Sequence, residues 1–196
     1  KLMLNKILII ILILKVNILT AFIAKAEEQF KFNVTQIEIL DNGNKVIGSS
    51  RGEIKTNDGL IISANNFVYD KIKNILNANG DVVIKDLSKN YEIFSNDITY
   101  IKDEDTIYSK GDTKAEIESR YEITSKDIVF LKKQNLFNSE SKTKIIDRET
   151  KTLYQLGIFN FDIFNEILKG EKILVNLNYN LPENDRLYFE NGIFDL

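Results

Sequence analysis

The sequence predicts an all-β fold, a stack of strands built from repeats of about 30 residues that follows an N-terminal signal peptide. Three observations predict it. Past residue 30 the chain is rich in Ile, Val, Phe, Tyr and Thr and contains one proline, Pro182, a composition that favours strands over helices. Apolar and polar residues alternate in short runs, as half-buried strands require. Aromatic residues also recur at a regular spacing.

Residues 1–26 have the features of a secretory signal peptide. Ile7–Leu14 is an unbroken apolar run, and Ala24 and Ala26 form an A-x-A cleavage site. The alternative is a retained transmembrane anchor. Lys15 interrupts the apolar stretch before it reaches the roughly 20 residues that span a bilayer, so we expect cleavage.

The composition of the remaining domain, residues 27–196, argues against several classes of function. The chain contains neither cysteine nor histidine, so disulfides, thiolate metal sites and the most common general base at neutral pH are missing. Removing residues 1–26 leaves 22 basic and 29 acidic residues, a net charge of −7. Nucleic acid binding needs a basic surface. We therefore expect no enzymatic activity, no cofactor, no metal site and no nucleic acid partner.

Strands and turns follow one another along this domain. Lys31–Val34, Gly80–Lys85 and Tyr91–Ser95 alternate apolar and polar side chains, the pattern of half-buried strands. Asp41–Gly43 and Asn57–Gly59 consist of residues that accept positive φ, so they mark turns.

Aromatic positions reveal the repeat. The residues Tyr69, Tyr100, Phe130 and Phe161 are spaced by 31, 30 and 31 positions. Two positions earlier in each repeat stand Phe67, Ile98, Ile128 and Phe159. A fixed period with short strands inside it is typical of stacked units whose equivalent side chains form a continuous apolar strip. Such a strip is a core if it is closed over and a binding groove if it is left open.

Two longer motifs carry a resemblance to a known family. Tyr91–Tyr100 reads YEIFSNDITY, and Tyr121–Phe130 reads YEITSKDIVF. Over about residues 30–175 this pattern resembles the organic-solvent-tolerance (OstA-like) family, which forms the periplasmic bridge of lipopolysaccharide transport. The resemblance implies a V-shaped β-jellyroll (β-taco) whose interior holds acyl chains of lipopolysaccharide, and whose end strands pair with the next bridge protein of the same fold.

Within this family, Gln29–Phe32 and Tyr179–Pro182 look most like the N-terminal periplasmic domain of the outer-membrane lipopolysaccharide-assembly protein LptD. That likeness implies a C-terminal barrel beyond Leu196, and an outer-membrane lipoprotein plug as a partner if the barrel follows. The protein would then be attached to the outer membrane. The alternative is a short, soluble periplasmic member of the family.

These considerations define two candidate sites. The lipid groove would be lined by the eight repeat residues Phe67, Tyr69, Ile98, Tyr100, Ile128, Phe130, Phe159 and Phe161. The first partner edge would lie in segment 30–40, with Phe32, Val34, Ile37 and Ile39 on the groove wall, and the second edge in segment 172–180. An unpaired edge strand offers N–H and C=O groups to a partner. The alternative function is a structural scaffold that assembles through its strand edges without lipid.

Acidic residues suggest weaker possibilities. Asp103–Asp105 could attract a hard cation, but we expect a solvated hairpin turn, because three consecutive side chains do not converge easily on one ion. Asp97 and Asp127 recur with the repeat, so we expect a turn or edge role for them and not a catalytic pair.

Overall fold

The computed structural model describes residues 29–196, so the predicted signal peptide and its cleavage residues Ala24 and Ala26 lie outside the described residues. The described chain forms one 16-stranded sheet in which every pairing is antiparallel. The all-β, stacked-strand prediction is confirmed. No helix within residues 29–196 is long and apolar enough to cross a membrane.

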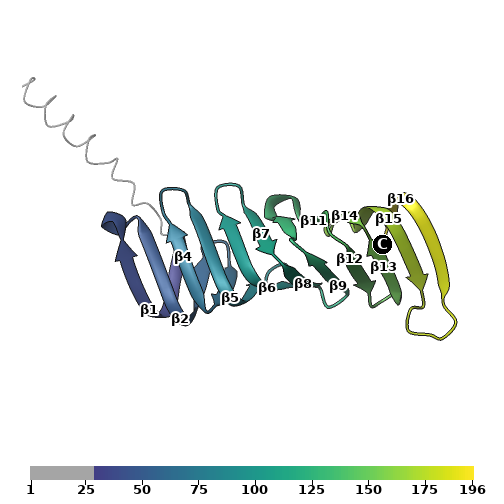
Figure 1. Ribbon diagram of the computed structural model, residues 1–196, viewed down its shortest axis with the longest axis horizontal. Coiled ribbons are helices and arrows are strands. Elements are labelled where there is room, and N and C mark those ends of the chain that lie inside the picture. The colour runs from purple at the N-terminus through teal and green to yellow at the C-terminus, as the bar shows by residue number, and fades with distance from the viewer. Residues whose placement is uncertain (1–28) are drawn as a thin grey trace, which may run out of the picture.

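The strands are stacked along the long axis of the molecule, with β1 at one end and β16 at the other (Figure 1). Their bounds are β1 Phe30–Leu40, β2 Lys45–Thr56, β3 Leu60–Ala64, β4 Asn66–Asp70, β5 Ile75–Asp86, β6 Tyr91–Ile101, β7 Thr106–Lys110, β8 Asp112–Ile117, β9 Tyr121–Lys126, β10 Val129–Leu131, β11 Leu136–Ser139, β12 Thr143–Asp147, β13 Thr152–Leu156, β14 Ile158–Asp162, β15 Ile167–Leu177 and β16 Asp185–Asp195. Two short 3-10 turns, η1 Asp41–Gly43 and η2 Lys132–Gln134, lie in loops.

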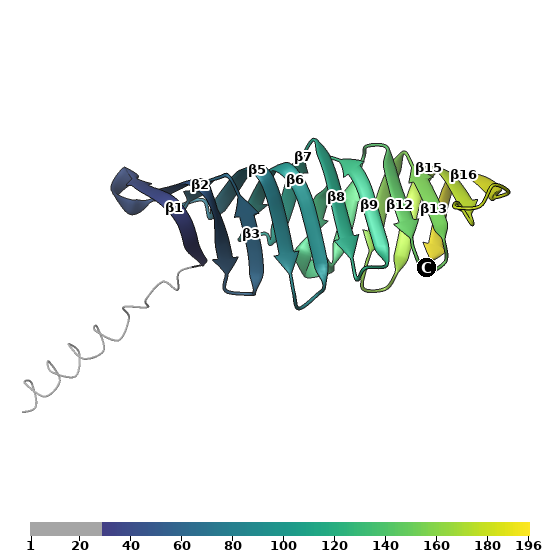
Figure 2. The same ribbon diagram turned by 90° about the horizontal axis from the view of Figure 1, so that it is seen from below.

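The sheet is folded into two walls. Wall one pairs, in order, residues 36–40, 45–49, 66–70, 75–79, 97–101, 106–110, 129–131, 136–139, 158–162, 167–171 and 191–195. Wall two pairs 30–34, 52–56, 60–64, 82–86, 91–95, 112–117, 121–126, 143–147, 152–156, 173–177 and 185–189. Long strands such as β5 and β15 cross from one wall to the other, so the walls are joined along one side (Figure 2).

A line of irregular backbone produces the bend between the walls. β1 and β5 carry register shifts there, and Arg51, Asp81 and Lys172 have positive φ. β-Bulges of this kind bend a strand and increase its twist. Asp127 also lies on this line with φ of 50°, and its carboxylate accepts a hydrogen bond of 2.7 Å from the backbone N–H of Gly111. Asp127 therefore has a turn role, whereas Asp97 lies within β6, paired with Asn79 and Lys110.

Hairpin turns form the two free rims opposite the bend. Rim one contains residues 41–44, 71–74, 102–105, 132–135 and 163–166, and rim two contains 57–59, 87–90, 118–120, 148–151 and 178–184. An aspartate carboxylate begins many of these turns: Asp70 and Asp86, for example, each accept two backbone N–H groups two and three residues ahead. Local side-chain bonds of this type stabilise turns.

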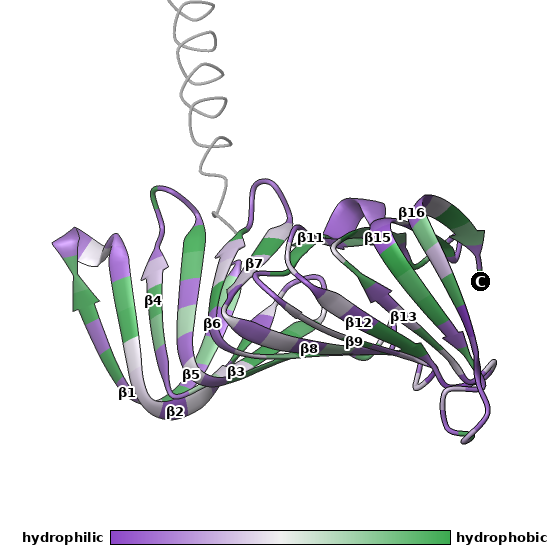
Figure 3. Ribbon diagram, turned by 45° about the vertical axis from the view of Figure 1, so that its right-hand side comes forward, coloured by the Kyte–Doolittle hydropathy of each residue, from purple (hydrophilic) through white to green (hydrophobic). Residues whose placement is uncertain are grey.

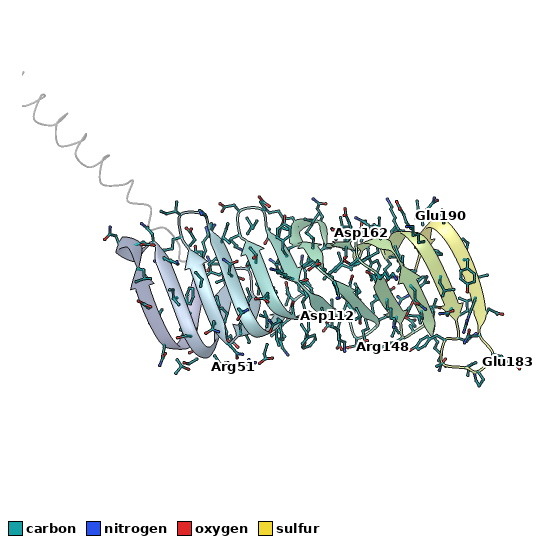
Figure 4. The ribbon with its side chains drawn as sticks, viewed as in Figure 1. Arg51, Asp112, Arg148, Asp162, Glu183 and Glu190 are labelled. Carbon is teal, nitrogen blue, oxygen red and sulfur yellow. The ribbon has the colours of Figure 1, made fainter. Side chains whose placement is uncertain are left out.

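Hydrophobic and hydrophilic residues alternate along the strands (Figure 3), so each wall has an inner apolar face. Charged side chains, including Arg51, Asp112 and Arg148, cover the outside (Figure 4). The buried core lies between the walls and extends from Phe30 to Val175.

Close contact between β1 and β2 requires a glycine. A Cβ atom added at Gly52 would lie 2.6 Å from a Val34 methyl group and 2.7 Å from both the Val34 Cα and the Asn33 carbonyl oxygen. We expect Gly52→Ala to lower the free energy of unfolding by about 1–3 kcal/mol, because overpacking forces the backbone to shift. Urea denaturation of this variant and of Gly157→Ala, where a Cβ would meet nothing nearer than 3.4 Å, measures the effect. Equal midpoints would contradict the expectation.

Candidate functional site

All eight predicted groove residues lie on the inner side of wall one or directly beside it. Their exposed fractions range from 0 to 7 %. Residues opposite one another in an antiparallel pair share a face of the sheet, so the pairing defines a continuous inward row. It consists of Ile39, Val46, Tyr69, Leu76, Tyr100, Ile107, Phe130, Phe137, Phe161, Leu168 and Phe194. At about 4.8 Å between strands, the row is roughly 50 Å long.

Wall two presents a matching apolar row to the interior. It consists of Phe32, Ile54, Ile62, Ile84, Ile93, Ala115, Ile123, Ile145, Tyr154, Val175 and Leu187. Aromatic contacts join the walls: the Tyr91 ring meets Phe130 edge-on at 5.0 Å, and the Tyr121 ring meets Phe161 in the same way at 5.0 Å. Along its middle, the strip is therefore closed and packed in this structure.

The strip is open at both ends. On β1, the inward side chains Ile37 and Ile39 are 56 % and 60 % exposed, and on β16 the inward side chains Leu187 and Phe189 are 44 % and 40 % exposed. Stacked-repeat proteins usually end in a capping unit with a polar outer face. Neither end of the described chain carries such a cap.

A cleft of about 640 Å³ occupies the N-terminal end. Its apolar lining consists of Phe30, Phe32, Ile37, Ile39, Val46, Tyr69 and Ile72. We call this cleft the N-terminal mouth. Of the four predicted edge residues, Phe32, Ile37 and Ile39 line it, while Val34 packs beside it against the core. All four project from β1 to the inner side, since their partners in β2 face inward.

The predicted second edge is wrong. Segment 172–180 ends β15, which is paired with β13 and β14 on one side and with β16 on the other. The segment's last residues form a turn, and Leu187–Phe189 belong to β16, the last strand of the described residues. Within residues 29–196, β1 and β16 are the strands whose outer edges have no partner.

Both terminal strands run in the same direction. β1 begins in wall two beside Thr56 and ends in wall one beside Lys45, and β16 begins beside Leu177 and ends beside Ile167. A partner that continues each wall without a break would therefore join β1 to a β16-like edge as parallel strands.

The sequence analysis missed a buried ionic cluster between the rims. Lys132, on rim one, is 5 % exposed and forms ion pairs with Asp58 of rim two and, at 3.6 Å, with Asp105. Lys102 binds the other Asp58 oxygen at 3.0 Å, and the Tyr100 hydroxyl donates a 2.6 Å hydrogen bond to Asp105. Asp103–Asp105 is indeed part of a hairpin turn, but Asp105 is largely buried and not solvated.

Burial and hydrogen bonding compete at Asp58. Burial alone would raise the pKa of its carboxyl, but hydrogen bonds from Lys132, Thr56 and Lys102 outweigh burial and hold the pKa well below its usual value. Burial and the neighbouring Asp105 raise the pKa of Tyr100, so its hydroxyl remains a donor.

A second cluster surrounds Arg120 on rim two. Its guanidinium binds both oxygens of Asp147, at 3.2 and 3.0 Å, and both oxygens of Glu166 on rim one, at 3.1 and 3.2 Å. It also lies 4.6 Å from the centre of the Tyr121 ring. The hydrogen bonds that the guanidinium donates to the Asp147 carboxylate raise the pKa of Arg120, which stays charged. No group of three His, Cys, Asp or Glu residues in the described part of the chain is arranged to hold a metal ion.

Comparisons with known proteins give little guidance. No family model matches the chain, and no curated protein matches it. Among solved structures, the chain is similar to LptH, the LptA-homologous periplasmic component of the lipopolysaccharide transport device of Pseudomonas aeruginosa, with a TM-score of 0.31 and 11 % sequence identity. The match covers 82 % of this chain and 95 % of LptH.

Proposed function

We propose that this protein binds acyl chains of lipopolysaccharide in the apolar interior between its walls and passes the lipid across the periplasm towards the outer membrane. One observation carries the proposal: the inward apolar rows continue without interruption to both ends, where Ile39 and Leu187 are exposed and no cap within residues 29–196 covers them. The OstA-like motifs of the sequence support the choice of lipid.

The chemistry of the cargo fits the interior. Each acyl CH₂ exposed to water costs about 0.8 kcal/mol, so a lipid with several long chains needs an apolar path through an aqueous compartment. The N-terminal mouth offers about 640 Å³ of mainly apolar space, within the usual size of a small-molecule site. An acyl chain that displaces water from Ile37 and Ile39 would bury apolar surface on both partners.

The terminal strands supply the connection to partners. We propose that β1 or β16 pairs with a periplasmic bridge protein of the same fold, so that the interior of one protein continues into the next. Backbone hydrogen bonds would give affinity, and the exposed inward side chains of both edges would be covered. The parallel pairing derived above keeps wall one beside wall one and wall two beside wall two.

Photo-crosslinking in cells tests the lipid proposal. We expect p-benzoylphenylalanine at Ile39, in the N-terminal mouth, to capture lipopolysaccharide, detected as a shifted band with an antibody against the lipid. The same probe at Tyr108, an exposed position paired with Thr99 and Val129 on the outer face of wall one, is the matched control and should capture none. Equal capture at both positions, or none at Ile39, would contradict the proposal.

A structural scaffold is the second candidate, and the closed packing of residues such as Phe130 and Tyr91 favours it. A scaffold would form polymers through β1 and β16 and would capture no lipid at Ile39. Size-exclusion chromatography of the same probe-bearing proteins shows whether they assemble.

A further inference from the structure

Polar contacts connect the two rims across the side of the molecule opposite the bend. Gln29 accepts a 2.8 Å hydrogen bond from Asn74, Asp58 pairs with Lys132 and Lys102, Lys89 donates a 2.8 Å bond to Asn135, and Arg120 binds Glu166. We call these four contacts the clasps. In each one, the first residue belongs to the wall-two side and its partner belongs to rim one.

The clasps follow the repeat. The wall-two residues Gln29, Asp58, Lys89 and Arg120 are spaced by 29, 31 and 31 positions. On rim one, Asn74, Asp105, Asn135 and Glu166 are spaced by 31, 30 and 31 positions, and each has a positive φ between 51° and 55°. Asp105 joins its clasp through Lys132. The same backbone position in each rim-one turn therefore contributes to the clasp.

Their position gives the clasps control over access to the interior. Continuous strands hold the walls together at the bend, whereas along the rims the walls meet through side chains. Separation of the walls therefore requires the clasps to break. The Lys89–Asn135 and Arg120–Glu166 clasps are at least partly exposed, whereas Lys132 of the Asp58 clasp is buried. Partly exposed pairs contribute little net free energy, because water replaces the lost partner, so these two clasps can release without unfolding the strands behind them.

We propose that the clasps form a latch that regulates loading: acyl chains enter the interior beyond the N-terminal mouth only where clasps release and the rims part. This inference rests on the proposed function, of which it specifies the regulation. The closed middle of the strip is then the latched state, and incoming acyl chains replace the contacts that Phe130 and Tyr91 make with each other.

A single introduced thiol reports release. The chain has no cysteine, so Ala115→Cys, at a fully buried inward position between the Lys89 and Arg120 hairpins, is a unique target for a maleimide. The release variant adds Lys89→Met and Glu166→Met, and leaves Arg120 bonded to Asp147. The matched control adds Arg148→Met, which breaks the 2.6 Å ion pair with Glu122 on the outside of wall two.

We expect the release variant to react about five to ten times faster than the parent, because it loses two weak contacts, and the control to stay within about twofold. Urea denaturation of all three proteins gives their free energies of unfolding, and from these the labelling rate expected from globally unfolded molecules alone. Equal rates in release and control variants, or a rise that global unfolding accounts for in full, would overturn the latch.

A locked variant separates this inference from the proposed function. A flexible bis-maleimide would join Lys89→Cys to Asn135→Cys across the rims. In the locked protein, we expect p-benzoylphenylalanine at Ile39, in the mouth, to capture lipopolysaccharide as before. We expect the same probe at Tyr154, beyond the lock, to capture the lipid without the cross-linker and to capture none with it. Capture at Tyr154 in the locked protein overturns the latch alone. Absence of capture at Ile39 in every variant overturns the proposed function, and the thiol rates still decide whether the rims open.

Discussion

Phe130→Ala is expected to lower the free energy of unfolding by about 3–5 kcal/mol, the usual cost of truncating a fully buried phenylalanine. The Phe130 ring stacks on Phe137 with ring centres 4.1 Å apart and lies edge-on to Tyr91 at 5.0 Å, so it joins two strands of wall one to wall two. Truncation leaves a cavity between the walls, and strands held in a hydrogen-bonded sheet cannot easily move in to fill it. Urea denaturation followed by circular dichroism measures the loss.

Phe164→Ala is the matched control, because the same atoms are removed from a rim-one turn where the side chain is 79 % exposed. We expect it to change the free energy of unfolding by less than about 0.5 kcal/mol, as exposed substitutions usually do. If both variants had the same stability, the Phe130 side chain would not lie in a packed core, and the latched state proposed above would be wrong.

The apolar interior could be predicted from sequence because two periodicities coincide. The strand period of two places Phe67 and Tyr69 on the same face, and the 30–31-residue repeat aligns them with Ile98 and Tyr100. Neither periodicity depends on knowing which strands pair, so both are visible in the bare sequence.

The bend and the second edge could not be predicted in the same way. Strands that cross the bend and strands that are interrupted there have similar alternation, so the sequence of β15 does not show whether another strand follows it. The turn at 178–184 contains Pro182, and β16 continues both walls after it. A proline ends one strand but says nothing of the next.

The clasp residues recur in the sequence at a fixed spacing, but their charges differ from one repeat to the next. Asp58, Lys89 and Arg120 share a repeat position but differ in charge, and the rim-one residues that bind them differ too: Lys132 pairs with Asp58, the Asn135 amide oxygen accepts from Lys89, and Glu166 pairs with Arg120. A search for repeated residue types misses such a set, because the repeat preserves the place of the contact and not the chemistry. Knowledge of which rims face each other is needed to see it.

Asp58→Asn is expected to lower the free energy of unfolding at neutral pH by about 3 kcal/mol, the low end for breaking a buried ion pair. Lys132 would keep its charge in a site where it is 5 % exposed, with Asp105 3.6 Å away as the remaining partner. The low end applies because Asp105 remains and because Asp58 itself is about one-third exposed.

The double variant Asp58→Asn/Lys132→Met removes both charges, and we expect its free energy of unfolding to recover to within about 1 kcal/mol of the parent, since apolar replacements of buried pairs are often nearly neutral. No recovery in the double variant would show that the pair is not the cause of the loss.

The pH dependence of the free energy of unfolding tests the role of the Asp58 carboxylate independently. The pKa of Asp58 is held well below its usual value in the folded protein, because hydrogen bonds from Lys132, Thr56 and Lys102 outweigh burial. A group whose pKa is lower in the folded state stabilises the protein above its unfolded pKa, and this contribution falls as the pH drops towards the folded pKa.

The difference in free energy of unfolding between the parent and Asp58→Asn should therefore be constant above about pH 5 and should narrow between about pH 4 and pH 2. Urea denaturation of both proteins across this range measures it, and a difference that stays constant down to about pH 2 would mean that Asp58 is not the titrating partner of the cluster. Because Asp105, the other ion-pair partner of Lys132, lies on rim one, loss of the Asp58 charge should also loosen the rims in acid. The thiolate fraction falls equally in both proteins as the pH drops, so the test is the labelling rate of the Ala115→Cys thiol in the parent divided by that in the Asp58→Asn background, and this ratio should rise below about pH 4.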